Sequence, residues 1–396
     1  MGCRCWVSAI GSRQCSFFAL SQQRTEGPAP GQKDIAMAWA DDSTLYLLVL
    51  AAWYFLAYVG TGIAPKAFTE GYFGVERISQ MENLYYSTVG SVGFVLLLMV
   101  VLGWHRRFRS TGSRMIGPFS FAREYGYLLP SGICTAIIIP TTTLMYTFGV
   151  SVMIAMVVMR GCIVVIGRLV DAIQIRQGIL KKRVPWEENV AVVFAIVAVA
   201  TALLKEPKPG ENPFSLLRSV PAMVTLGSYV GAYLVRIYIM NWYKNTNAGK
   251  TDNKAFFVAE QAFAALTLVV VVGALLMWGP EDQRMRAVRH AATAPYALAM
   301  LGGIPFGLAA IPSVLLLMYK GRTGTFSTLV NRLTSLIAGT ISTLLLIPLG
   351  GKAPVLLDWI AFGFVLVAVG FLAKAERRRA VLQSVVPGTL PASVRN

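Results

Sequence analysis

The sequence predicts an all-α polytopic membrane protein with ten transmembrane helices arranged as two inverted five-helix repeats. Three observations support this class. Of the 396 residues, 55% are hydrophobic and only 14% are charged, which is too apolar for a soluble chain of this length. Ten apolar segments follow one another, each long enough to cross a bilayer. The last five segments repeat features of the first five, which predicts two related halves.

Short polar connections separate the ten segments, and each segment is predicted to form one membrane helix. The predicted helices cover approximately residues 44–64, 85–104, 125–148, 150–171, 189–204, 219–242, 255–278, 295–319, 325–349 and 354–373. The domain boundaries follow from these helices: a disordered cytoplasmic tail over 1–42, the two repeats over 43–205 and 206–375, and a basic cytoplasmic tail over 376–396. Met37 is an alternative start to Met1.

The formal net charge of +17 raises the question of nucleic-acid binding. The basic residues, however, gather in short clusters between apolar segments, as the positive-inside rule describes. An N-terminus in the cytoplasm places most of the basic residues of the connections on that side. We therefore expect no nucleic-acid partner, a multi-pass protein of the plasma (inner) membrane or an endomembrane, and both termini in the cytoplasm.

Buried arginines define the repeat. Arg160 lies inside the fourth segment and precedes Gly167 by the interval that separates Arg332 from Gly339 in the ninth. The motif IIIPTTTLMY of the third segment also resembles AAIPSVLLLMY of the eighth, and each places a proline, Pro140 or Pro312, where it would kink a helix. Five helices per repeat is an odd number, so the second copy enters the membrane from the opposite side. Inverted repeats of this kind are typical of secondary transporters.

An arginine inside a membrane helix costs from about 2.5 to over 10 kcal/mol, so a functional role is the default hypothesis. Its planar cation suits carboxylate or phosphate groups. We therefore expect Arg160 and Arg332 to bind an anionic substrate. Neutral or acidic side chains at a similar depth complete the predicted site: Asn331, Glu260, Gln261, Tyr146 and Thr142. The alternative is structural, with the arginines in fixed ion pairs and the neutral groups joining helices.

Two glutamates are candidate partners of these arginines. We hypothesise a gate made of the pairs Glu82 with Arg160 and Glu260 with Arg332, formed and broken as the halves move. A further arginine, Arg236, lies close to a predicted cytoplasmic helix end, where a structural role is expected.

The fourth segment, VVMRGCIVVIGRLVDAI, resembles the Met-Arg-Gly segment of nucleotide-sugar-transporter-like solute carriers. Together with ten helices in two inverted halves, it makes the chain similar to the drug/metabolite transporter superfamily, which includes the EamA-like proteins. The resemblance implies that basic residues of the fourth and ninth helices, here Arg160 and Arg332, face a central cavity.

The leading hypothesis is a secondary transporter of a small polar, anionic metabolite that works by alternating access. The first alternative is a proton-coupled exporter of amino acids or amphipathic drugs, with Glu260 as proton carrier, and the second is a non-transporting structural protein. No Walker motif, zinc spacing or catalytic signature is present in the sequence, so we expect no enzyme activity, cofactor or metal. Besides lipid and substrate, a second copy of the chain remains an open partner.

Overall fold

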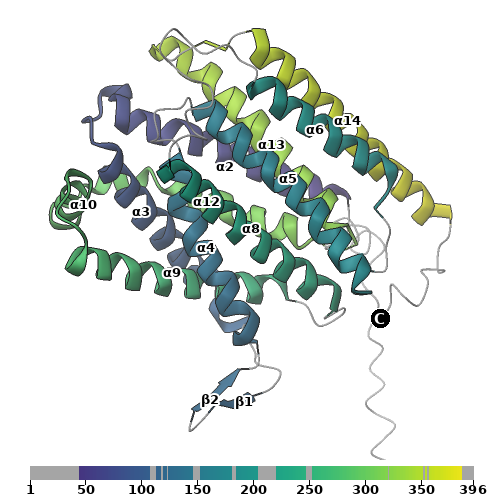
Figure 1. The fold of residues 1–396 in the computed structure, drawn as a ribbon, viewed down its shortest axis with the longest axis horizontal. Coiled ribbons are helices and arrows are strands. Elements are labelled where there is room, and N and C mark those ends of the chain that lie inside the picture. The colour runs from purple at the N-terminus through teal and green to yellow at the C-terminus, as the bar shows by residue number, and fades with distance from the viewer. Residues whose placement is uncertain are drawn as a thin grey trace, which may run out of the picture.

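The protein is a bundle of long helices, with one short β-hairpin beyond the end of one helix (Figure 1). The structure is a computed structural model. It describes residues 44–107, 113–116, 119–122, 124–145, 152–180, 184–203, 220–246, 252–319, 321–350, 353–354 and 356–385.

The helices follow the sequence in the order that the apolar segments predict. They are α2 (Thr44–Glu70), α3 (Gln80–Val101), α4 (Tyr125–Met145), α5 (Val152–Arg176), α6 (Trp186–Leu203), α8 (Val220–Thr246), α9 (Asn253–Trp278), α10 (Gln283–Thr293), α11 (Ala297–Leu301), α12 (Ile304–Leu317), α13 (Gly324–Leu346) and α14 (Leu356–Val385). Three 3₁₀ turns, η1 (Tyr72–Gly74), η2 (Trp104–Arg107) and η3 (Ile347–Leu349), adjoin helix ends.

Each of the ten predicted segments coincides with a helix, and the eighth is divided into α11 and α12. Eight helical stretches of the described residues are long and apolar enough to cross a membrane. They are Thr44–Glu70, Gln80–Val101, Tyr125–Met145, Val220–Thr246, Asn253–Trp278, Ala297–Leu317, Gly324–Leu349 and Trp359–Arg378. The class of multi-pass membrane protein is thereby confirmed. The helices α5 and α6 are not among the eight.

Three features of the fold depart from the predicted elements. The strands β1 (Ser113–Ile116) and β2 (Phe119–Ala122) form an antiparallel hairpin between α3 and α4, where no strand was expected. The helix α10 was also missed, because it is too polar to be a membrane segment. Its first turn is fixed by Asp282, whose carboxylate accepts a hydrogen bond from the Met285 amide at 2.7 Å. Finally, α14 continues to Val385, through the beginning of the predicted C-terminal tail. Residues 1–43 and 386–396, the rest of the two predicted tails, lie outside the described residues.

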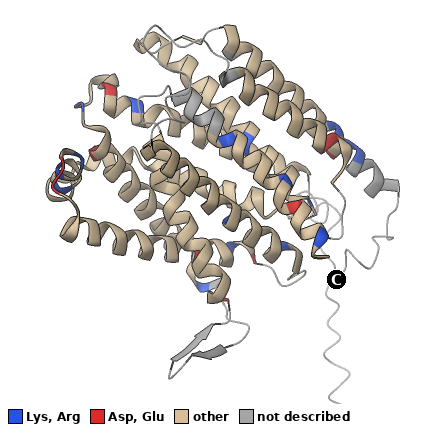
Figure 2. Cartoon of the chain, viewed as in Figure 1, with Lys and Arg blue, Asp and Glu red and all other residues tan. Residues whose placement is uncertain are grey.

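The exterior of the bundle is apolar, as a bilayer requires. Large apolar side chains are well exposed on α3 and α9, among them Leu97, Val100, Val101, Val269 and Val270. Figure 2 shows long uncharged stretches of helix, with many of the charged residues toward helix ends. Lipid tails can cover these apolar side chains, so that they are not exposed to water. The polar groups inside the bundle are therefore the candidates for a functional site.

The two predicted halves pack against each other in reciprocal pairs. The third helix of the first half, α4, packs on α8 and α9, while its counterpart in the second half, α12, packs on α2 and α3. In the same way α13 contacts α2 while α5 contacts α8. The contacts of α5 with α13 and of α6 with α14 each join helices at corresponding places in the two predicted halves. Figure 1 shows α6 and α14 side by side.

Two glycines at equivalent places allow these close contacts. A Cβ atom added to Gly132 of α4 would lie 3.0 Å from the Glu260 carbonyl oxygen of α9 and 2.4 Å from the Phe263 Cβ. A Cβ atom added to Gly303, at the start of α12, would lie 2.3 Å from the Ser87 carbonyl oxygen of α3. The sequence spacing of the two glycines is within one residue of that between Arg160 and Arg332. Both contacts require a residue without a side chain.

Candidate functional site

Each half contributes one arginine that lies over a tyrosine ring. Arg160 of α5 is 1% exposed, its guanidinium carbon lies 4.7 Å from the centre of the Tyr58 ring on α2, and it donates a hydrogen bond to the Tyr58 hydroxyl. Arg332 of α13 is equally buried and lies 4.5 Å from the centre of the Tyr233 ring on α8. A cation over an aromatic face is stabilised by about 2 kcal/mol or more when both are desolvated.

A second tyrosine precedes each of these rings by one helical turn. Tyr54 lies 4.8 Å from Tyr58 on α2, and Tyr229 lies 4.8 Å from Tyr233 on α8, between ring centres. Tyr54 and Tyr229 are both within electrostatic reach of both arginines. The six buried side chains thus form one assembly, which we call the arginine–tyrosine cluster: Tyr54, Tyr58, Arg160, Tyr229, Tyr233 and Arg332.

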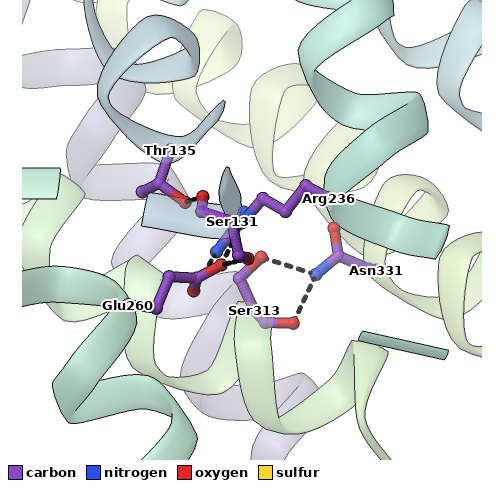
Figure 3. A network of polar contacts seen from close by, with 6 residues as sticks. All are labelled: Ser131, Thr135, Arg236, Glu260, Ser313 and Asn331. Atoms are coloured by element: carbon purple, nitrogen blue, oxygen red, sulfur yellow. Dashed lines mark hydrogen bonds and ion pairs between the residues drawn. The ribbon is translucent and has the colours of Figure 1, made fainter. Parts of the chain in front are cut away.

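A neighbouring ion pair joins Arg236 to Glu260 through one edge of the guanidinium group. Arg236 of α8 donates from Nε to Glu260 Oε1 at 2.9 Å and from Nη2 to Glu260 Oε2 at 2.8 Å. Ser131 of α4 donates to the same carboxylate at 2.5 Å (Figure 3). The two charges are almost fully buried, and the bidentate geometry matches both carboxylate oxygens.

The Nε and Nη2 atoms of Arg332 have different surroundings from those of Arg236. Its Nε and Nη2 are buried and have no hydrogen-bond partner among the residues that the structure describes. Leaving a buried charged donor unsatisfied is costly. In Arg236 the same two nitrogen atoms donate to the Glu260 carboxylate.

Asn331 connects the cluster to the neighbouring helices. The Tyr54 hydroxyl donates to Asn331 Oδ1 at 3.1 Å, and Asn331 Nδ2 donates to Ser313 Oγ on α12 at 3.0 Å. Figure 3 shows the Asn331 amide turned toward Ser313. These bonds orient α2, α12 and α13 around Arg332, so Asn331 is placed to fix the geometry of the site.

The expected gate pairs are not the pairs that the structure forms. Glu260 is bound to Arg236, and Arg332 makes no ion pair among the described residues. Glu82 lies in the first turn of α3, where it forms a capping box with Ser79 and lies 2.8 Å from His290 Nδ1 of α10. Both predicted pairs are therefore wrong: Arg236 of α8 is the arginine that binds Glu260 of α9, and Glu82 lies beside His290.

The other predicted site residues have varied surroundings. Thr142 donates its hydroxyl to the Ile138 carbonyl of its own helix at 2.7 Å, and Gln261 is buried beside Glu260 on α9. Pro140 and Pro312 lie inside α4 and α12, which continue through them. Tyr146 lies outside the described residues.

The four tyrosines of the cluster were missed by the sequence analysis, although a signal exists. The first helix of each half carries a pair of tyrosines four residues apart, in YFLAY and in YVGAY. Both pairs would lie on one helix face. Alignment of the first helices of the halves, rather than of the third and fourth, would have found them.

The described residues include no group of three or more His, Cys, Asp or Glu side chains placed to hold a metal ion. Cys134 and Cys162 are free thiols.

Comparisons with known proteins bear on the fold alone. No model of a protein family and no curated protein sequence matches the chain. Solved structures do resemble it, and one of them, described simply as the crystal structure of a protein, is 13% identical with a TM-score of 0.50. The match covers 82% of this chain and 98% of that one. At this identity the similarity supports a shared arrangement of helices and carries no activity.

Proposed function

We propose that the protein is a secondary transporter that moves a small anionic metabolite across a membrane by alternating access, with the arginine–tyrosine cluster as its binding site. The observation that carries the proposal is the buried Nε and Nη2 edge of Arg332, which has no hydrogen-bond partner among the described residues. Ionisable groups inside membrane segments usually mark the path of a substrate or ion.

The architecture that we propose for this transporter has ten spans in two inverted five-helix repeats. Supporting observations are the reciprocal packing of α4 and α12, the matched contacts of Gly132 and Gly303, and the two equivalent arginine–tyrosine units. A site at the interface of two such halves becomes accessible from each side in turn when the halves rock. Assignment to the drug/metabolite transporter superfamily, with both termini cytoplasmic, belongs to the same proposal.

Ligand-dependent stabilisation of the purified protein tests the proposed site. A ligand that binds the folded state raises the melting temperature by mass action. We expect at least one anionic metabolite, among anionic, neutral and cationic compounds, to stabilise the wild type and to lose this effect in Arg160→Ala and in Arg332→Ala. The α10 variant Arg284→Ala, at an exposed residue, is the matched control and should respond like the wild type. Selective stabilisation by neutral or cationic compounds, or an unchanged response of both buried-site variants, would refute the proposal.

The exporter alternative rests on Glu260 as a proton carrier, and it makes a distinct prediction. Flux would then depend strongly on outward pH, and Glu260→Gln would abolish that dependence while leaving the protein folded. In the structure Glu260 is engaged by Arg236 and Ser131, which favours the anion-transporter reading.

A further inference from the structure

The arginine–tyrosine cluster contains the same unit twice, once from each predicted half. Arg160 lies over Tyr58 with Tyr54 one turn away, and Arg332 lies over Tyr233 with Tyr229 one turn away. The two ring-to-guanidinium distances, 4.7 and 4.5 Å, are nearly equal. A site built from two equivalent cationic units is complementary to a ligand with two anionic ends.

The positive charge of the site also favours a ligand with two negative groups. The third arginine of this region, Arg236, is neutralised by Glu260 within a bidentate pair. Arg160 and Arg332 repel each other electrostatically, and in a buried site of low dielectric constant this repulsion is weakly screened. A monoanion on one guanidinium group relieves part of the repulsion, whereas a ligand with two negative groups can bind at both.

We infer that the ligand of the cluster is a dianion with two separate negative groups, one bound to the Nε and Nη2 edge of Arg332 and the other directed to Arg160. This inference rests on the proposed function and narrows its substrate class. The tyrosine rings would line the segment that joins the two groups, and Asn331, held by Tyr54 and Ser313, would keep the Arg332 end of the site in place.

Two series of matched acids test the inference on the purified full-length protein. One series is malonate, succinate, glutarate and adipate, and the other is the monocarboxylates with the same numbers of carbon atoms. Methyl phosphate adds a ligand whose charge, close to two, is confined to one group. Affinities are measured by thermal shift and by isothermal titration calorimetry. We expect the best dicarboxylate to bind at least tenfold more tightly than its monocarboxylate partner and than methyl phosphate.

Variants then assign the two ends. Arg160→Gln and Arg332→Gln should each reduce the ratio of dicarboxylate to monocarboxylate affinity to about one, and the exposed Arg284→Gln should leave it unchanged. Arg332→Lys keeps the charge but removes the bidentate edge, so it should weaken dicarboxylate binding while retaining part of the preference. If a glutamine variant does not fold, the wild-type series and the lysine variant decide the question.

The outcomes separate this inference from the proposed function. If the two series bind equally tightly, or if methyl phosphate binds most tightly, the ligand is not a dianion with two separate negative groups. The proposed function as an anion transporter would still stand. Binding of some other monoanion with no dicarboxylate binding would lead to the same two conclusions. The absence of any anion binding would overturn both.

Discussion

Four arginines are buried among the described residues, and they differ in the groups that neutralise or surround them. Arg322 pairs with Glu376 and lies over the rings of Tyr319 and Phe326. Arg236 forms a bidentate ion pair with Glu260, whereas Arg160 and Arg332 lie over tyrosine rings. Burial of an ion from water costs several kcal/mol, so each arrangement needs compensating contacts. We expect the ion pair to stabilise the fold. The Nε and Nη2 edge of Arg332 is the one that we propose as a ligand contact.

Glu260→Gln should destabilise the protein by about 3–5 kcal/mol, because it leaves the Arg236 charge buried without its partner. Unfolding in detergent, followed by the loss of helical circular dichroism, measures this change. The matched control is Glu281→Gln. Glu281 is 88% exposed, and its carboxylate lies as far as 3.9 Å from the Arg289 guanidinium. Removing such an exposed, loose ion pair should not change the stability measurably. Equal stability of wild type and Glu260→Gln would show that the ion pair is not structural.

At this scale the sequence located the buried charges better than it predicted their partners. Arg160 and Arg332 were found because charge inside an apolar run is conspicuous. The partner of Glu260 was wrong, because side-chain contacts depend on how each helix is rotated about its axis. A single sequence contains no direct measure of this rotation.

Among the elements, α13 carries Arg332 and is held firmly at its first turn. The Asp171 carboxylate of α5 accepts hydrogen bonds from the Gly324 amide at 3.0 Å, the Thr325 amide at 2.6 Å and the Thr325 hydroxyl at 2.6 Å. Thr323 caps the same turn, with its hydroxyl accepting from the Phe326 amide. A carboxylate at a helix N-terminus also interacts favourably with the helix dipole. These contacts link α5 of one half to α13 of the other.

Asp171→Ala should loosen the start of α13, because it removes a charged acceptor from four buried donors, three on α13 and the side-chain amide of Asn241 on α8. We expect a loss of about 1–3 kcal/mol and faster amide hydrogen exchange over 324–326. Asp282→Ala provides the control, since it removes the equivalent cap from α10 and should leave exchange in α13 unchanged. Unaltered exchange over 324–326 in Asp171→Ala would contradict the assigned role.

Glu188 should make the stability of the contact between α6 and the start of α13 depend on pH. It lies in the acidic first turn of α6, ahead of the apolar run, and accepts a hydrogen bond from the Thr323 hydroxyl at 2.5 Å. Burial, with a smaller contribution from Asp171, raises the pKa of Glu188 to about 7. A raised pKa means that the folded state holds the proton more tightly than the unfolded state.

The stabilising contribution of protonated Glu188 should therefore be complete below the unfolded pKa and should be lost as pH rises through about 7. Melting temperatures measured from pH 4.5 to 8 should fall with pH in the wild type, and Glu188→Gln should reduce that slope. A slope identical in the two proteins would contradict the assignment.

Secondary structure was predicted more completely than side-chain geometry. All ten apolar segments coincide with helices, because the length and composition of a membrane helix are constrained by the bilayer. The hairpin of β1 and β2 and the helix α10 were missed, because polar connections carry no such constraint. The glycines that split α11 from α12 lie inside a continuous apolar run, so the break was not apparent from hydropathy.

For the whole molecule, the packing of the two halves is the main argument for an inverted repeat. Exchange of the halves converts the contacts of α4 into those of α12 and the contacts of α13 with α2 into those of α5 with α8. The ion pair of Arg236 with Glu260 joins α8 to α9. The proposed halves would therefore share their helix packing and differ in their side-chain contacts.

Membrane topology tests the ten-span architecture. With ten spans, the connection between α5 and α6 lies on the same side as the C-terminus; with α5 and α6 outside the membrane, it lies on the opposite side. In a cysteine-free background, we expect Arg176→Cys to be labelled from the same side as a cysteine added at the C-terminus. Arg286→Cys on α10 should be labelled from the other side in either case. Labelling of Arg176→Cys together with Arg286→Cys would contradict ten spans.

Charge movement on solid-supported membranes tests the central claim most directly, because it detects transport of an anion without a labelled substrate. Wild-type proteoliposomes should give a saturable transient current when an anion identified by thermal stabilisation is applied, and Arg332→Gln should reduce it to the level of empty liposomes. The same current should persist in Arg284→Gln. The absence of current in the wild type with every stabilising anion, or an unchanged current in Arg332→Gln, would contradict an anion transporter built around the arginine–tyrosine cluster.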